Sequence, residues 1–420
     1  MPAAASAGSG SAGAGAKQVR VRMYNVGFGD CLLFFLPTDM GERTMLVDCG
    51  AHMSGAANPM SAITKDLVAS VSTDGRARID VVVATHRHFD HISGFDMKIW
   101  NEVEVGEVWM PWTEERGNAR ADALRTSQQR LAAALAARFP SAADPVGWLA
   151  LNSFSNAGAE HTLLKGFAGT PHHRFLPDPD RDKRSFTTPL LTGITVHALG
   201  PSHDLAIVAT LEPPKGKYFP EPAKAAARGR SDGAAPTNAA LAAVFSDRHR
   251  VTPADYARRY PSLAGNADTR ELQRRAEADY MGAAAALEDA INGTSLVLAL
   301  EIGDACLLLA GDAEWGTWSE VLADRAWTEL LTRTVLYKVS HHGSLNGTPK
   351  PFVDDLLPND AVSLMSFRPV AKWPSIPRET LVAALGQGKR TLFRTDAMPA
   401  PSPTVTRNGN LWVEITVPLQ

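Results

Sequence analysis

The sequence is poor in several features that define whole classes of protein. It has three cysteines in 420 residues, and Cys31, Cys49 and Cys306 all lie in apolar, strand-like runs. An odd number of dispersed cysteines argues against a disulfide scaffold and indicates a reducing compartment. No apolar run reaches the roughly 18 residues that a membrane-spanning helix requires. A soluble, cytoplasmic protein with no membrane partner is therefore expected.

The sequence also lacks a large excess of charge of either sign. The formal net charge is -3, with 45% hydrophobic and 21% charged residues, which is ordinary globular composition with ample chain for a core. These totals give no global indication of nucleic-acid binding, although they leave room for a local basic groove. Residues 1–17 are almost entirely Ala, Gly and Ser and lack the basic and leucine-rich regions of a signal peptide. We predict that they form a disordered tail.

The most informative segment that is present runs from His86 to His91, directly after the apolar run 79–84. His86 and His88 are two residues apart on an extended backbone, so their side chains project to the same side and can share one metal ion. Asp90 and His91 follow where the chain turns toward a helix, and they face a neighbouring position. Imidazole and carboxylate ligands without thiolates suit zinc, manganese or iron, and two ions about 3.5–4 Å apart are a known hydrolytic arrangement. The alternative explanation is a solvated histidine cluster.

The order of the predicted elements indicates the fold class. Apolar periodicity predicts strands at 19–24, 31–36, 43–48, 79–84, 103–109, 194–199, 295–300, 305–310, 335–340, 361–366, 391–394 and 411–417, and helices at 61–70, 119–138, 315–331, 352–357 and 378–385. Residues at about 213–288 are rich in Ala, Arg, Asp, Pro and Gly and are predicted to be a partly helical insertion or lid. Two batches of strands, each followed by helices, predict an α+β protein over residues 18–420: an αββα sandwich with helices outside two packed sheets.

Two further polar clusters follow predicted strands. Gly311-Asp312 comes after the run 305–310, and Ser340-His341-His342 comes after the run 335–339. A carboxylate at a strand end can face two metal ions at once, and an imidazole at the next strand end can complete the second shell. A Gly-Asp pair alone more often marks a turn. Adjacent histidines at a buried strand end, together with the first motif, favour metal ligands.

On these residues the chain resembles the metallo-β-lactamase fold superfamily, and within it the hydrolase domain of the DNA-uptake competence protein ComEC, here as a stand-alone domain without the membrane channel. The matching segments include 25–31, 47–50, 86–94, 199–201, 292–298, 309–314, 338–344 and 394–396. The resemblance implies two divalent metal ions, zinc first and manganese as the alternative. It implies six ligands. His86 and His88 would bind the first ion, Asp90, His91 and His341 would bind the second, and Asp312 would bridge the two.

The resemblance also implies catalytic roles. Asp90 would orient the attacking hydroxide from the second ion. His342 is either the alternative to His341 as a ligand or the acid that protonates the leaving group. Many superfamily members have a further histidine on the first ion. His197 and His203 flank the Leu-Gly-Pro turn here, but neither matches a motif, so no further ligand is assigned.

The function implied is metal-dependent hydrolysis by a metal-bound hydroxide in a dinuclear site. The leading hypothesis is a phosphodiesterase or nuclease, with nucleic acid as the substrate. Arginine-rich patches at 224–230 and 248–259 are possible phosphate contacts, although a solvated helical face is the favoured explanation of them. A second hypothesis keeps the site but changes the substrate to a small ester, phosphoester or lactone. A third is a catalytically idle interaction module on the same fold.

Overall fold

The computed structural model describes residues 17–52, 55–141, 144–154, 156–220, 267–370 and 374–419. The predicted tail lies outside these ranges except for Lys17, and residues 221–266 of the predicted insertion lie outside them too. The described end of that insertion belongs to one helix, α9 (Ala267–Asn292). Within the described ranges, no helix is both long and apolar enough to cross a bilayer.

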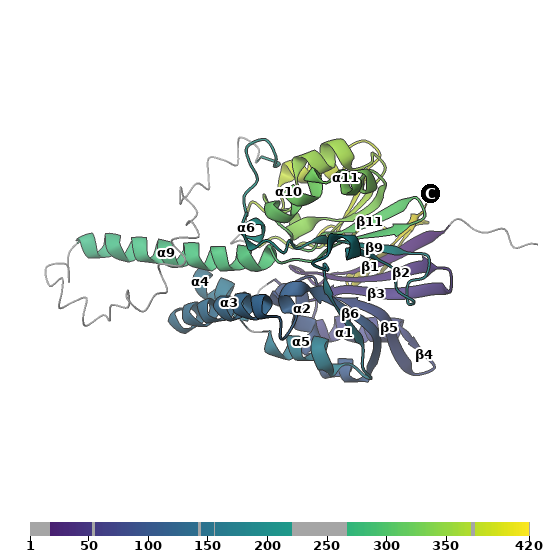
Figure 1. Ribbon diagram of the computed structural model, residues 1–420, viewed down its shortest axis with the longest axis horizontal. Helices are drawn as coiled ribbons and strands as arrows, with labels where there is room; N and C mark the ends of the chain where they lie inside the picture. Colours follow the sequence, from purple (N-terminus) through teal and green to yellow (C-terminus); the bar gives the residue numbers. More distant parts are fainter. Residues whose placement is uncertain are drawn as a thin grey trace, which may run out of the picture.

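Two β-sheets pack face to face, with helices on their outer faces (Figure 1). In spatial order the first sheet consists of β15 (Val405–Asn408), β16 (Trp412–Pro418), β1 (Gln18–Tyr24), β2 (Cys31–Thr38), β3 (Gly41–Cys49), β5 (Arg76–Val83), β6 (Val103–Pro111) and β7 (His172–Leu176), with β4 (Ser72–Thr73) paired to β5. The second consists of β14 (Thr391–Arg394), β13 (Val362–Met365), β12 (Thr334–Lys338), β11 (Ala305–Leu309), β10 (Val297–Ile302), β9 (Thr195–Gly200) and β8 (Ser185–Phe186). This arrangement confirms the predicted αββα sandwich.

The helices form three groups. Those beside the first sheet are α1 (Met60–Ser70), α2 (Phe89–Ile92) and α5 (Ala157–His161), and those beside the second are α6 (Leu205–Val208), α10 (Trp315–Ala323) and α11 (Arg325–Leu331). Helix α12 (Glu379–Leu385) contacts β14 of the second sheet. The third group is α3 (Ala119–Arg138), α4 (Pro145–Phe154) and α9, which project together from one end of the sandwich. Short helical turns lie at Ser93–Asp96, Lys98–Glu102, Trp112–Glu114, Thr162–Gly166, Arg181–Lys183, Ser340–Gly343 and Phe352–Leu356.

Strand β2 shows how the sequence fills three layers at once. Successive side chains of a strand point to opposite faces of a sheet. Leu32 and Phe34 face the second sheet and are packed in one cluster with Leu298 of β10, whereas Leu33 lies in the cluster beneath α1. Burying each such side chain stabilises the fold by about 1.5–3 kcal/mol relative to leaving it exposed. The continuous apolar run of β2 is therefore explained by burial on both faces.

The carboxyl ends of the parallel strands place the functional residues. Strands β3, β5, β6 and β7 run parallel in the first sheet, and β11, β12, β13 and β14 run parallel in the second. Side chains that follow parallel strands meet at one edge of a sheet. The residues after β3 and β5 consequently face those after β11 and β12 across the sandwich.

Some elements differ from the sequence-based expectation. The single helix predicted over 315–331 is two helices, because the carboxylate of Asp324 accepts hydrogen bonds from Ala326 N at 2.9 Å and Trp327 N at 3.2 Å and so caps a new helix. Helix α4 and strand β7 were not predicted. Strand β7 is partly exposed, and its sequence His172-His173-Arg174 lacks the apolar alternation that marks a strand.

The Glu107 carboxylate ties β6 to β7 and to the segment that crosses between the sheets. It accepts hydrogen bonds from Trp109 Nε1 at 2.7 Å, Arg174 Nε at 2.8 Å and Thr188 Oγ1 at 2.6 Å. Burial alone would raise the pKa of Glu107, but these bonds, that of Arg174 first, lower it below its ordinary value of 4.5. A carboxyl with a lowered folded-state pKa contributes stability that is present above the unfolded pKa and is lost as the pH falls through the folded pKa.

For Glu107→Gln we therefore expect a loss of about 1–3 kcal/mol in the free energy of unfolding at pH 7. The amide nitrogen of glutamine takes the place of one carboxylate oxygen and cannot accept a hydrogen bond from the three donors that surround this position. The difference from wild type should shrink as the pH falls from 4.5 through the lower folded-state pKa of Glu107, because the wild-type carboxyl then becomes neutral too. Urea unfolding at several pH values measures both quantities. A difference that is constant with pH would contradict this account.

Candidate metal centre

A buried carboxylate fixes the start of the His86–His91 segment. Asp48, at the end of β3, accepts hydrogen bonds from Thr85 N and Thr85 Oγ1, both at 2.7 Å. Asp48 has a φ of 55°, a left-handed conformation that is uncommon outside glycine and persists where surrounding contacts enforce it. Thr85 Oγ1 in turn lies 3.1 Å from His86 Nδ1. The first histidine therefore leaves the strand in a defined orientation.

His86 and His88 bring one ring nitrogen each to the same point. His86 Nε2 lies 3.0 Å from His88 Nδ1, and the two residues are 1% and 2% exposed. Burial lowers the pKa of His86 well below its ordinary value and lowers the pKa of His88 to about 3. Both rings are therefore neutral near pH 7, which is the form that binds metal ions.

Asp90 and His91 lie in α2 and face the second sheet. His91 Nδ1 is 2.8 Å from Asp48 Oδ2, and His91 Nε2 is 3.1 Å from Asp312 Oδ2. Burial opposes a charge on His91, but the carboxylates around it, Asp312 first, raise its pKa well above the ordinary value. Burial would raise the pKa of Asp90, yet the nearby histidines, His91 first, lower it. The positive charge of His91 and the negative charges of the nearby carboxylates thus compensate one another at this centre.

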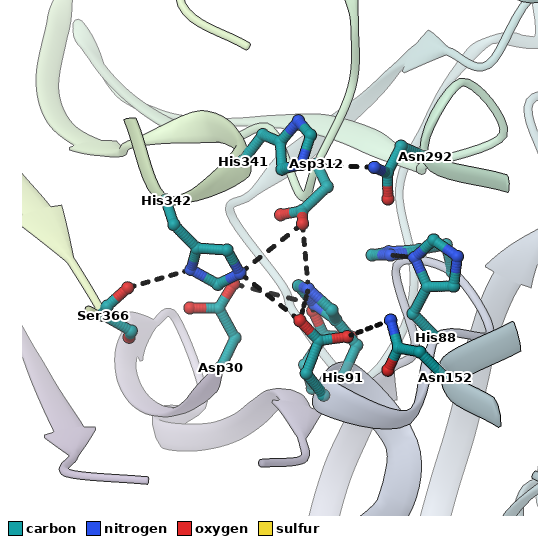
Figure 2. Close-up of polar contacts among 12 residues, drawn as sticks. Asp30, His88, His91, Asn152, Asn292, Asp312, His341, His342 and Ser366 are labelled. Carbon is teal, nitrogen blue, oxygen red and sulfur yellow. Dashed lines mark hydrogen bonds and ion pairs between the residues drawn. The ribbon is translucent and has the colours of Figure 1, made fainter. Parts of the chain in front are cut away.

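Asp312 and His342 reach the same point from the ends of β11 and β12 (Figure 2). His342 Nε2 lies 3.5 Å from Asp312 Oδ2 and 3.7 Å from Asp90 Oδ2, while His342 Nδ1 lies 2.9 Å from the carbonyl oxygen of Ser366. One ligand atom each from Asp30, His91, Asp312 and His342 lies within 4.8 Å of the other three. The two sheets therefore contribute jointly to one buried group of donors.

The two adjacent histidines point in different directions. His341 and His342 have φ values of 48° and 49°, so two consecutive left-handed residues turn the chain sharply. His341 Nε2 lies 3.2 Å from Asn292 Nδ2 at the end of α9, and the two rings are 6.4 Å apart. Burial lowers the pKa of His341 to about 4. His342 is thus the histidine that the fold brings to Asp90 and Asp312.

A buried lysine balances the carboxylates. Lys338 Nζ forms an ion pair with Asp30 Oδ2, lies 3.6 Å from Asp312 Oδ1 and donates a hydrogen bond to the Gly311 carbonyl oxygen at 3.3 Å. Its side chain is 3% exposed. Burial opposes the lysine charge, but the carboxylates, Asp30 first, raise its pKa. Lys338 is therefore a fixed positive charge inside the cluster.

The donors fit divalent metal ions. Among the described residues, Asp312 Oδ1 and His342 Nε2 are buried atoms with no hydrogen-bond partner, and an unsatisfied buried polar atom costs about 1–3 kcal/mol. A cation would satisfy both. Neutral imidazole nitrogens and carboxylate oxygens are the ligand types that zinc and manganese accept. The chemistry of the site therefore agrees with a metal centre.

A cavity of about 330 Å³ opens onto this group. His88, Asp90, Asp312 and both adjacent histidines line one side, and α9 supplies Glu288, Asp289 and Asn292 on another. Ser344 and Asn346 also line it. The Ser344 hydroxyl donates to Asn346 Oδ1 at 2.8 Å.

Sequence reasoning gave no role to several residues of the centre. Asp30 and Asp48 are two of these residues, although they lie in the segments 25–31 and 47–50 that carry the family resemblance. A lysine that closes the apolar run 335–337 is an anomaly that could have drawn attention to Lys338. Of the two histidines left open, His197 contacts Ser185 and Glu301, and His203 stacks on Trp112. Within the described part of the chain, these hydrogen bonds and ring contacts join both histidines to residues outside the centre.

A comparison with known protein families finds a match for part of the chain. A family model for the metallo-beta-lactamase superfamily matches residues 25–212. No curated protein was found to match the chain. The matched range contains Asp30, Asp48 and the whole His86–His91 segment. Asp312, His341 and His342 lie beyond it, so only the structure joins them to the matched part.

Proposed function

Because residues 25–212 carry a metallo-beta-lactamase superfamily domain, we propose that the protein is a hydrolase with two divalent metal ions, zinc or manganese. His86 Nε2 and His88 Nδ1 would hold the first ion. Asp90, His91 and His342 would hold the second, and Asp312 would lie between the two. The observation that supports this assignment is the convergence of imidazole and carboxylate atoms from both sheets on one buried point. His342, the alternative to His341 in the sequence analysis, would thus take the place of His341 on the second ion.

Such ions supply Lewis acidity and lower the pKa of a bound water toward 7. The chain's own groups then have defined tasks. Asp90 and Asp312 remain ionised, because the neighbouring histidines lower the pKa of each below its ordinary value against the effect of burial. Hydrolysis joins the water oxygen to phosphorus or carbon, breaks the bond to the leaving oxygen and delivers a proton to that oxygen. Asp289 lines the cavity, and burial raises its pKa to about 7, so it is suited to carry that proton.

The proposed substrate is a phosphodiester, with nucleic acid favoured by the likeness to the ComEC hydrolase domain. Arg378 is the non-histidine cation among the described residues that line the cavity and is suited to a phosphate oxygen. The arginine-rich patches 224–230 and 248–259 lie outside the described residues. A second candidate is a small ester, phosphoester or lactone. The volume of about 330 Å³ supports it, since this is the lower end of small-ligand pockets.

We expect chelation to abolish hydrolysis and added zinc or manganese to restore it. Hydrolysis should be measured on end-labelled single-stranded DNA, on a chromogenic phosphodiester and on a chromogenic acetate ester. Cleavage of DNA supports the nuclease, and cleavage of the small diester alone supports a phosphodiesterase acting on small molecules. Cleavage of the acetate alone moves the assignment to esters. A purified protein that binds no metal would contradict the proposal. The remaining hypothesis would then be an interaction module without catalytic activity.

A further inference from the structure

The four histidines of the metal centre have one nitrogen facing inward and one facing outward. In three of them, Nδ1 is held by an outer partner and Nε2 faces the centre. The pairs are His86 with Thr85 Oγ1 at 3.1 Å, His91 with Asp48 Oδ2 at 2.8 Å and His342 with the Ser366 carbonyl oxygen at 2.9 Å. An outer partner of this kind fixes the tautomer and the orientation of a metal-binding imidazole.

His88 has the opposite arrangement. Its Nδ1 faces inward, 3.0 Å from His86 Nε2, and its Nε2 faces outward. That Nε2 is buried and has no hydrogen-bond partner within the described ranges. The carboxylate that it faces is Glu288, whose Oε2 lies 3.5 Å away. This separation is a few tenths of an ångström beyond a hydrogen bond, a gap that a small change in a side-chain torsion closes.

Glu288 is held in place from the other side. Its Oε1 accepts a hydrogen bond from Asn152 Nδ2 at 2.6 Å, and its Oε2 accepts one from Ser153 Oγ at 3.2 Å. Asn152 Nδ2 also lies 3.4 Å from Asp90 Oδ1. One amide of α4 therefore connects Glu288 to the second half of the centre.

The packing of α9 fixes the position from which Glu288 projects. Leu287 and Ile291, on the same helix, are 2% and 1% exposed and lie in one apolar cluster with Trp148 and Leu149 of α4. A helix whose apolar face is packed in this way cannot slide without losing that burial. The carboxylate is therefore presented to His88 by a rigid element.

We propose that Glu288 is a positioning residue of the metal centre: its carboxylate accepts the Nε2–H of His88 and thereby directs His88 Nδ1 to the first ion. The inference rests on the proposed function, which places that ion at His86 and His88. It makes the helix that follows residues 221–266 a part of the centre. The docking of α9 then sets the affinity for the first ion.

The test is titration with Co²⁺, whose visible absorption reports the coordination of each ion. Glu288→Gln keeps the size of the side chain and replaces one of its two acceptor oxygens with an amide group that cannot accept a hydrogen bond. We expect the affinity for one ion to fall about 10–100-fold and the affinity for the other to stay as in wild type. Asp279→Asn, an exposed carboxylate on the same helix, is the matched control and should titrate as wild type.

A second measurement uses the wild-type protein and so does not depend on the folding of a variant. In zinc-loaded protein with ¹⁵N-labelled histidine, His88 should carry its proton on Nε2, whereas His86, His91 and His342 should carry it on Nδ1. The loss of a signal in His88→Asn assigns it. An unchanged Glu288→Gln titration, or a proton on Nδ1 of His88, overturns the inference and leaves the two-ion proposal standing. A wild-type protein that binds no metal contradicts the proposed function instead.

Discussion

Asp312→Asn should lower kcat/KM about 10³-fold, because it removes the negative charge that lies between the two proposed ion sites. The Asp312 carboxylate lies 3.1 Å from His91 Nε2 and 3.5 Å from His342 Nε2. Burial would raise its pKa, but His91, His342 and Lys338 lower it well below the ordinary value, so the group is an anion. The asparagine amide is neutral, and its nitrogen would present hydrogen atoms to the metal ions. Metal content by elemental analysis should fall together with the rate.

The matched control is Asp304→Asn. Asp304 is an exposed aspartate in the turn between β10 and β11, the strand that ends just before Asp312. This variant should keep both the metal content and kcat/KM of wild type. Asp312→Asn protein with full metal content and wild-type kcat/KM would remove Asp312 from the centre.

Lys338→Met should lower the free energy of unfolding of the metal-free protein by about 3–5 kcal/mol, the usual cost of removing one partner of a buried ion pair. The variant loses the ion pair with Asp30 and the contact with Asp312. Two buried carboxylates are then left without their lysine. Urea unfolding in the presence of a chelator measures the loss.

Divalent metal should narrow the difference from wild type, because the carboxylates released from the lysine bind the ion more tightly, and an ion that binds only the folded state stabilises it more when its dissociation constant is lower. Lys389→Met, at an exposed position, should change stability by no more than about 0.5 kcal/mol. A Lys338→Met deficit that is the same with and without metal would show that the lysine does not balance the metal-binding carboxylates.

The elements and their ends were predictable because their signals are local. The runs before His86, Asp312 and His341 are apolar and rich in branched side chains, which mark buried strands. Polar residues directly after such strands stand out in a sequence. These strand ends predict which edge of the sandwich holds the candidate site. In the structure the polar residues that follow them lie together at that edge.

Other parts of the centre depend on information that is not local. Glu288 belongs to a region of unremarkable helical composition, and it meets His88 only because α9 packs on α4. The choice between His341 and His342 depends on two left-handed φ values, which no pattern of residue types specifies for non-glycine residues. The ion pair of Lys338 with Asp30 joins residues from opposite sheets. Such contacts follow from the fold and cannot be read from spacing.

The pairing of β1 with β16 has a consequence for how the molecule assembles. Gln18 lies opposite Pro418, and Tyr24 lies opposite Trp412, so one sheet is built from strands at opposite ends of the described chain. Contacts between residues so distant in sequence carry a large loop-closure entropy and slow the folding of a chain. The hairpin that presents Asp30 follows β1 directly. We therefore expect the buried donors of the candidate metal centre to come together late in folding, after β1 and β16 have paired.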